Sequence, residues 1–136
     1  MKLTLSILPD EFAICQFDRA LPIPNWSLQG FFAITRTQDE LSIVCPQADV
    51  PQTAQAEGFE GNWRCFKIEG PLDFALTGVL VAIAVPLAAA DISIFAISTY
   101  ATDYVLVKQS VLERAVQVLL QAGHQVVPAS LTHTAS

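Results

Sequence analysis

The chain has 136 residues, a net charge of −6 and a mean hydropathy of +0.45, with 52% hydrophobic and 15% charged residues. It is long enough and apolar enough to bury a core, which excludes a disordered protein. Because only 7 Lys and Arg oppose 13 Asp and Glu, we expect neither a nucleic acid nor an anionic membrane surface as its partner. The apolar excess instead predicts a surface that is buried against another protein chain.

In the first half of the chain, the pattern predicts short strands at residues 3–8 and 11–17, and a hairpin of residues 31–35 and 40–45. Pro22 and Pro24 break any long helix between the second strand and the hairpin. They leave room for one helical turn at Asn25, which could cap it. Residues 46–62 are polar and contain Pro51 and two glycines, so they are the expected boundary between two parts.

The second half predicts longer elements. Strands are expected at residues 63–69, 92–99, 103–107 and 125–127, with helices at residues 73–90 and 110–122 between them. Pro86 should kink the first helix. The second helix has a capping box, Ser110 to Glu113, and Gly123 is placed to end it. The order β-α-β-β-α-β is that of a ferredoxin-like fold with an antiparallel sheet. We therefore expect residues 1–62 and 63–127 to form two domains, followed by a mobile tail at residues 128–136.

The two halves also resemble each other. Residues 31–35 align with residues 94–98, and residues 40–44 with residues 103–107, both at an offset of 63, which places Glu40 opposite Asp103. The first strands align at an offset of 53, so the first half lacks about the length of one helix. The alternative is a chance similarity between apolar strands.

The cysteines and the amino-terminal segment bear on the compartment. Cys15, Cys45 and Cys65 are odd in number and form no CxxC pair, so we expect neither disulfides nor a zinc site. The first residues turn acidic too early for a signal peptide, and the longest uncharged run, residues 74–90, is too short for a transmembrane helix. We therefore expect a cytoplasmic protein with reduced cysteines.

Two segments carry a family resemblance. GPLDFALTGVL at residues 70–80, followed by ISIFAISTYATDYVLV at residues 92–107, resembles an ACT domain. The subtype is similar to the regulatory domains of aspartate kinase and to the CASTOR-type amino-acid sensors. The resemblance implies an α+β fold of two ACT units, the first with shortened helices. It also implies that a free amino acid binds at an interface between ACT units.

The residues are compatible with such a ligand. The first turn of a helix has unpaired backbone N–H groups, which can receive a carboxylate, and a nearby acid can bind the ammonium group. Two hydroxyl side chains stand beside that acid. The candidate ligand residues are Leu76, Thr77, Gly78, Val79, Ser98, Thr99 and Asp103. In the alternative interpretation, Asp103 is a solvated turn acid, Gly78 a helix-packing contact, and Ser98 and Thr99 cap the hairpin.

The sequence also limits the ligand and the function. No second carboxylate follows Gly78 on the helix, so a small or neutral amino acid fits better than one of the arginine type. His124 is expected to face water at a helix end, and Cys45 is expected to be a buried apolar residue at a strand end. Without a metal cluster, GxGxxG or P-loop, we expect neither a metal nor a cofactor, and no enzymatic activity. The predicted function is an amino-acid-binding regulatory ACT protein that forms a homodimer, and the alternative is a ligand-free dimerisation or interaction module.

Overall fold

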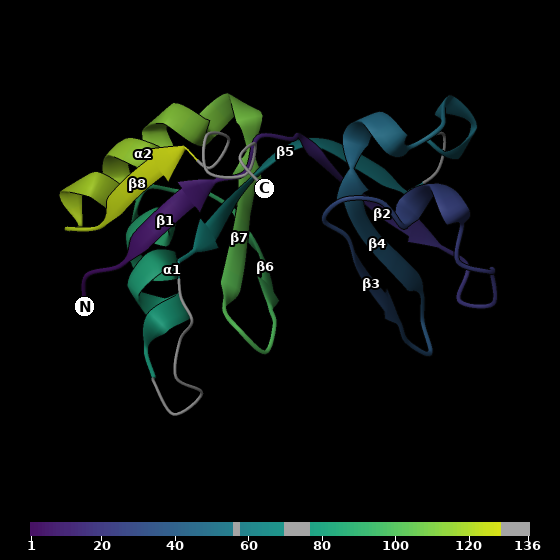
Figure 1. Cartoon of the computed structure of the whole chain (residues 1–136), viewed down its shortest axis with the longest axis horizontal. Helices are drawn as coiled ribbons and strands as arrows, with labels where there is room; N and C mark the ends of the chain where they lie inside the picture. Colours follow the sequence, from purple (N-terminus) through teal and green to yellow (C-terminus); the bar gives the residue numbers. More distant parts are fainter. Residues whose placement is uncertain (56–57, 70–76, 129–136) are drawn as a thin grey trace. The chain divides into compact units, whose positions relative to one another are not determined.

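The structure is a computed structural model that describes residues 1–55, 58–69 and 77–128. The chain divides into two compact units (Figure 1). Asp10–Trp63 forms the inserted unit, and Met1–Pro9 together with Arg64–Ser136 forms the main unit. The first nine residues therefore group with the second half of the chain, and not with residues 10–62 as the sequence indicated. The expected tail lies almost wholly outside the described residues.

The main unit contains a sheet in the order β6-β7-β5-β1-β8. β1 pairs antiparallel with the second half of β5 and parallel with β8, so the sheet is mixed, although an antiparallel sheet was expected. Without β1, this is the predicted ferredoxin-like order; the insertion of β1 between β5 and β8 was not predicted. The strands are β1 (Thr4–Ile7), β5 (Phe59–Ile68), β6 (Phe95–Ser98), β7 (Asp103–Lys108) and β8 (Gln125–Pro128).

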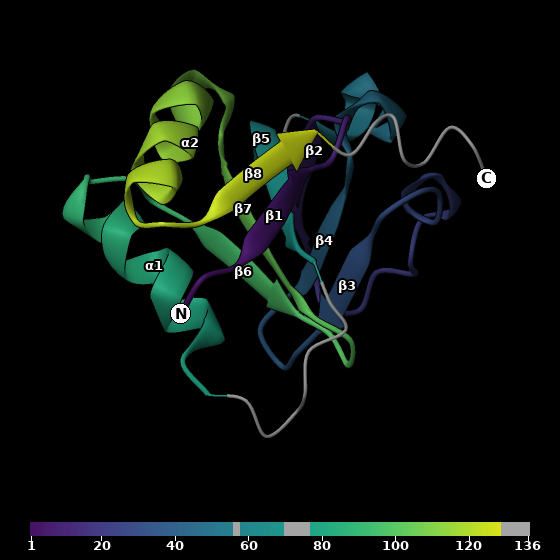
Figure 2. The same cartoon turned by 60° about the vertical axis from the view of Figure 1, so that its left-hand side comes forward.

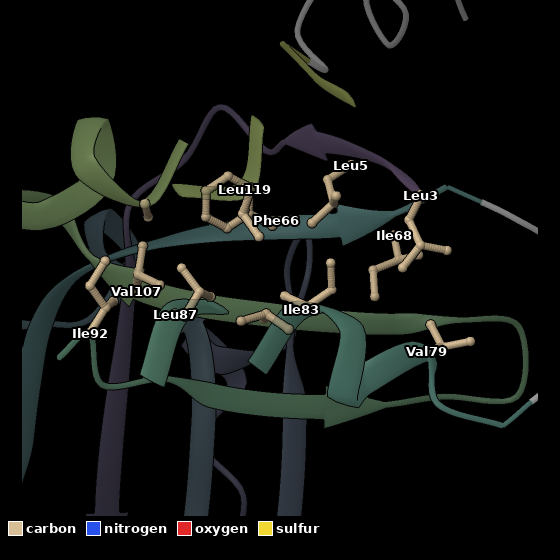
Figure 3. Close-up of a cluster of buried hydrophobic side chains, with 12 residues drawn as sticks. Leu3, Leu5, Phe66, Ile68, Val79, Ile83, Leu87, Ile92, Val107 and Leu119 are labelled. Atoms are coloured by element: carbon tan, nitrogen blue, oxygen red, sulfur yellow. The ribbon is translucent and has the colours of Figure 1, made fainter. Parts of the chain in front are cut away.

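Two helices, α1 (Val79–Ala89) and α2 (Leu112–Gln121), lie on one side of this sheet (Figure 2). Side chains alternate between the two faces of a strand, and those on the helix-covered face meet the apolar sides of both helices. Figure 3 shows this core, which contains Leu5, Phe66, Ile68, Val107, Ile83, Leu87 and Leu119.

Both helices begin later than the sequence predicted. α1 starts at Val79, because Gly78 adopts a left-handed conformation (φ +82°) that is not helical; the expected helical residues 73–76 lie outside the described residues. α2 starts at Leu112, and the predicted capping box is wrong because Ser110 lies inside a short 3-10 helix, η4 (Gln109–Val111), and caps nothing. Gly123 does end α2, with φ +97° and its N–H donating to the Leu120 carbonyl.

Pro86 lies inside α1, where its missing N–H leaves the Ala82 carbonyl without its usual helical partner. His124 replaces that donor: its Nε2 lies 3.1 Å from the Ala82 oxygen, and its Nδ1 lies 3.1 Å from the Leu3 nitrogen. Because the Leu3 N–H can only donate and a carbonyl can only accept, this arrangement requires a neutral ring with the proton on Nε2. His124 is buried, so the expectation that it faces water is wrong.

The inserted unit has an antiparallel sheet in the order β3-β4-β2, continued by the first half of β5. Among its described residues the helices are short 3-10 turns, which agrees with the expected shortening of the helices in the first repeat. Its core is separate from that of the main unit and includes Cys15, Leu41, Ile43 and Cys45. The elements are β2 (Phe12–Phe17), β3 (Ala33–Arg36), β4 (Leu41–Pro46), η1 (Asn25–Ser27), η2 (Gln47–Asp49) and η3 (Gln52–Ala54).

The structure supports the internal repeat but corrects its offset. β3, β4 and η2 correspond to β6, β7 and η4 at an offset of 62 throughout. The two hairpins share one turn, in which the N–H of Thr37 or Thr99 donates over 2.9 Å to the carbonyl of Glu40 or Thr102.

The predicted offset of 63 is therefore wrong by one residue. Identical residues in the two apolar strands favoured the offset of 63. A slip of one residue, however, moves every side chain to the opposite face of a strand. Glu40 corresponds to Thr102, and the position of Asp103 is occupied in the inserted unit by Leu41, which is fully buried.

Candidate functional site

The β6–β7 hairpin brings two of the predicted ligand residues together. Ser98 and Asp103 are paired across the two strands, next to the turn. Asp103 lies two and four residues before Val105 and Val107, which belong to the core beneath the helices, so its side chain is on the helix-covered face. The turn and the first turn of α1, at Val79, lie at the same end of the unit (Figure 3).

The start of α1 provides backbone groups and space. Ala82 donates the first helical hydrogen bond, to the Gly78 carbonyl over 2.9 Å, so the N–H groups of residues 79–81 precede it and have no helical acceptor. A side chain at Gly78 would meet no atom within 4 Å, which leaves the backbone there open to approach. Val79 is 6% exposed and packs in the core, so its backbone alone is available. Leu76 lies outside the described residues.

Asp103 is half-buried. Within the described part of the chain, its carboxylate makes no hydrogen bond or ion pair, and the exposed Ser98 hydroxyl makes none either. Glu69, at the end of β5, lies on the opposite face from Phe66 and Ile68, where it accepts a hydrogen bond from Ser6. Asp103 is therefore the available acid on the helix-covered face at this end of the described structure.

The other hydroxyls of the turn have structural partners. Thr99 Oγ1 donates to the Thr102 carbonyl (3.0 Å) and accepts the Thr102 N–H (3.3 Å), so the hairpin-cap interpretation applies to Thr99. Thr102 is buried, and its Oγ1 donates over 2.6 Å to the Ile68 carbonyl at the end of β5. Sequence reasoning missed this link, because a threonine in a polar turn gives no periodic signal of burial.

The metal-binding and thiol chemistry of the described residues is limited. No group of three or more His, Cys, Asp or Glu side chains among them could hold a metal ion. Burial raises the pKa of Cys15 to about 11 and that of Cys45 and Cys65 to about 12, so the thiols remain protonated and are poor nucleophiles. None of the helices in the described part of the chain is long and apolar enough to cross a membrane.

A shallow hollow of about 520 Å³ lies in the inserted unit. Its wall is mostly apolar, with Phe17 and Trp26 in edge-to-face contact and three prolines, and its polar side chains are Asn25 and Thr53. Its wall has no charged side chain to pair with the carboxylate or the ammonium group of a free amino acid. None of the predicted ligand residues lines it.

Comparisons with known proteins agree with this architecture. Residues 58–121 match the family model of the ACT domain, and residues 10–53 match a second model, described as an N-terminal domain. The cytosolic arginine sensor for mTORC1 subunit 1 of Bos taurus is 37% identical over 101 residues, which are 71% of this chain and 31% of that protein; the Homo sapiens protein gives the same values. The chain thus spans about a third of the length of these relatives.

Solved structures resemble the whole chain. A protein of Agrobacterium tumefaciens is 36% identical, with a TM-score of 0.87 and 94% of each chain covered. The regulatory subunit of aspartate kinase from Thermus thermophilus is 14% identical, with a TM-score of 0.60 over 90% of this chain and 99% of that one, a likeness of fold alone. From the matched model, residues 58–121 of this chain form an ACT domain.

Proposed function

We propose that this chain is a non-enzymatic regulatory protein that binds a free amino acid beside the first turn of α1. The observation that carries the proposal is the placement of Asp103, which has no partner among the described residues. Asp103 lies on the helix-covered face of β7, opposite Ser98. The turn that joins β6 and β7 lies at the end of the main unit where α1 begins (Figure 3). The resemblance to an arginine sensor and to aspartate kinase regulatory subunits supports this class of function.

In the proposed complex, each charged group of the ligand has an opposite charge or dipole to meet. The carboxylate accepts hydrogen bonds from the N–H groups of residues 79–81, where the helix dipole is positive. The ammonium group donates to the Asp103 carboxylate and to the Ser98 hydroxyl. The open backbone at Gly78 lets the ligand approach closely. We further propose that the inserted unit is a degenerate ACT-like partner of the main unit, and that the protein works in the cytoplasm as a homodimer.

The ligand is proposed to have a small or neutral side chain. The curated relatives are described as arginine sensors, and a guanidinium group would need a second acid. All eleven residues of α1 are apolar, so the helix beyond Gly78 supplies none. Arginine would therefore bring one more positive charge than this part of the site can pair.

Calorimetry with the twenty free amino acids tests the proposal. We expect one or a few neutral amino acids to bind, and Asp103→Asn to weaken the best of them by about 10- to 150-fold, the loss of one charged hydrogen bond. Glu40→Gln is the matched control, because Glu40 lies beside the equivalent turn of the inserted unit and accepts a hydrogen bond from Gln16 (3.2 Å).

Two results would contradict the proposal in different ways. If Glu40→Gln weakens binding and Asp103→Asn does not, the ligand binds in the inserted unit. If none of the amino acids binds or raises the melting temperature, the chain is the ligand-free interaction module instead.

A further inference from the structure

One buried side chain fastens the turn between β6 and β7 to the rest of the sheet. Thr102, the residue just before β7, is 5% exposed, and its Oγ1 donates a hydrogen bond over 2.6 Å to the Ile68 carbonyl at the end of β5. Its N–H and its carbonyl are both bound to Thr99. Because the side chain is buried and its hydroxyl proton is already used, Thr102 is not itself a ligand contact.

The two polar side chains of the proposed site both depend on this anchored residue. Asp103 follows Thr102 directly in the chain. Ser98 is paired with Asp103 across the strands, and it precedes Thr99, whose N–H and hydroxyl are bound to Thr102. Among the described strands β6 pairs with β7 alone, so the turn is joined to β5 through β7 and through the Thr102 hydroxyl.

The equivalent turn of the inserted unit shows which of these bonds the turn itself requires. There the Thr37 N–H donates over 2.9 Å to the Glu40 carbonyl, and Thr37 Oγ1 accepts the Glu40 N–H (3.1 Å). Thr99 makes the same two bonds with Thr102. Glu40 stands at the position of Thr102 and has no hydroxyl, so the turn folds without one at this position.

The bond from the turn to the strand is therefore an addition found in the main unit. The Glu40 carboxylate accepts a hydrogen bond from Gln16, and a carboxylate has no proton to donate to a strand carbonyl. In the inserted unit Leu41 also occupies the position of Asp103. The hydroxyl at the Thr102 position and the acid that follows it thus occur together in one unit and are both absent from the other.

We propose that Thr102 is a positioning residue of the amino-acid site. Its bond to the Ile68 carbonyl holds the β6–β7 turn in the conformation in which Asp103 and Ser98 receive the ammonium group of the ligand. This inference rests on the proposed function and deepens it. A site that is held ready in the free protein spares the ligand the cost of ordering it. Without this bond the turn takes the binding conformation only part of the time, and the apparent affinity falls by that fraction.

Calorimetry on the full chain tests this role, with each of the twenty free amino acids as the probe. Thr102→Val keeps the shape of the side chain without the hydroxyl, and it should raise the Kd of every amino acid that binds the wild type by about 10-fold. Thr102→Ala lacks the same hydroxyl and should behave alike. Thr102→Ser keeps the hydroxyl and should bind within about 2-fold of the wild type.

The matched control is Thr37→Val, which removes a turn hydroxyl from the inserted unit and should bind like the wild type. A double-mutant cycle then separates positioning from general support of the fold. If Thr102 acts through Asp103, Thr102→Val should weaken binding by no more than about 2-fold once Asp103→Asn is present. A loss of stability alone would have the same effect in both backgrounds.

Amide hydrogen exchange, followed by NMR, reports on the turn without any ligand. The Thr99 N–H, which donates to the Thr102 carbonyl, should exchange about 10-fold faster in Thr102→Val than in the wild type. The Thr37 N–H of the equivalent turn should be unchanged, and Thr102→Ser should restore the slow exchange at Thr99.

Three results would overturn the positioning role and leave the proposed function standing. They are equal binding by the wild type and Thr102→Val, the full loss of affinity in the Asp103→Asn background, and unchanged exchange at Thr99. If none of the twenty amino acids binds the wild type, the proposed function fails, and the positioning role fails with it.

Discussion

Burial controls the chemistry of the three thiols. Cys15 and Cys45 lie in the core of the inserted unit, and Cys65 lies on β5 in the main unit. Their pKa values are raised from 9.0 because a thiolate loses its hydration in the protein interior; Asp49 and Cys15 raise that of Cys45 further. The folded protein therefore favours the neutral thiols, and unfolding releases them to ionise.

This linkage predicts how stability depends on alkaline pH. Each raised pKa contributes stability that is complete below the unfolded value near 9 and is lost as the pH rises toward the folded value. The free energy of unfolding in urea should therefore fall between about pH 9 and pH 11. A variant with Cys15→Ala, Cys45→Ala and Cys65→Ala should show a smaller slope over this interval. Equal slopes for the two proteins would mean that other groups control the alkaline transition.

The site shows what single residues reveal before a structure is known. The family motif placed Ser98, Thr99 and Asp103 in one hairpin, and the structure puts them there. The motif could not show that the Ser98 hydroxyl is free while the Thr99 hydroxyl is hydrogen-bonded, because the difference depends on the geometry of the turn. The sequence also could not show that Leu41, and not Glu40, occupies the position equivalent to Asp103, since the apolar residues of the two strands fit either register.

Among the elements, α1 depends on a side chain distant in the sequence. The residues of α1 favour a helix except at Pro86, and the hydrogen bond from His124 compensates for the missing N–H. The same ring accepts the Leu3 N–H just before β1, so one side chain joins a helix, a strand and the turn after α2. Sequence patterns identify Pro86 as a break but do not reveal the partner that repairs it.

A double-mutant cycle tests this role. His124→Ala leaves the Ala82 carbonyl and the Leu3 N–H without partners, so it should destabilise the fold by about 2–4 kcal/mol in urea unfolding. Pro86→Ala restores a backbone N–H for Ala82, and in that background His124→Ala should cost about 1 kcal/mol less. Strictly additive effects would mean that the ring and the proline act independently.

In the whole molecule, two separate cores lie on one chain. The first, beneath α1 and α2, shares no residue with the second, in the inserted unit. Among the described residues both α-helices belong to the main unit, whereas both tryptophans, Trp26 and Trp63, lie in the inserted unit. Circular dichroism at the helix band and tryptophan fluorescence therefore report on different units.

Leu5→Asp should separate the two signals. Leu5 is fully buried in the core of the main unit, so an aspartate there should cost more than about 3 kcal/mol. The helix signal should be lost at much lower urea concentration, with little change in the tryptophan transition. If both transitions shift together, the ten-residue strand β5 couples the units into one cooperative structure.

The predictable part of the fold was local. The order of strands and helices in residues 63–127 and the end of α2 at Gly123 followed from periodicity and glycine. The mixed sheet did not, because the four residues of β1 carry no sign of their partners. Thr4 pairs with Gln125, 121 residues away.

That pairing also orders events during synthesis on the ribosome. Every sheet partner of the inserted unit lies between residues 10 and 63, so this unit can acquire its fold early, as the chain emerges. β1 is synthesised before the inserted unit but obtains its neighbour β8 only after residue 128 has left the exit tunnel, because loop closure over such a separation cannot precede the chain that forms it. A strand made before the inserted unit is therefore completed in its sheet after that unit can fold.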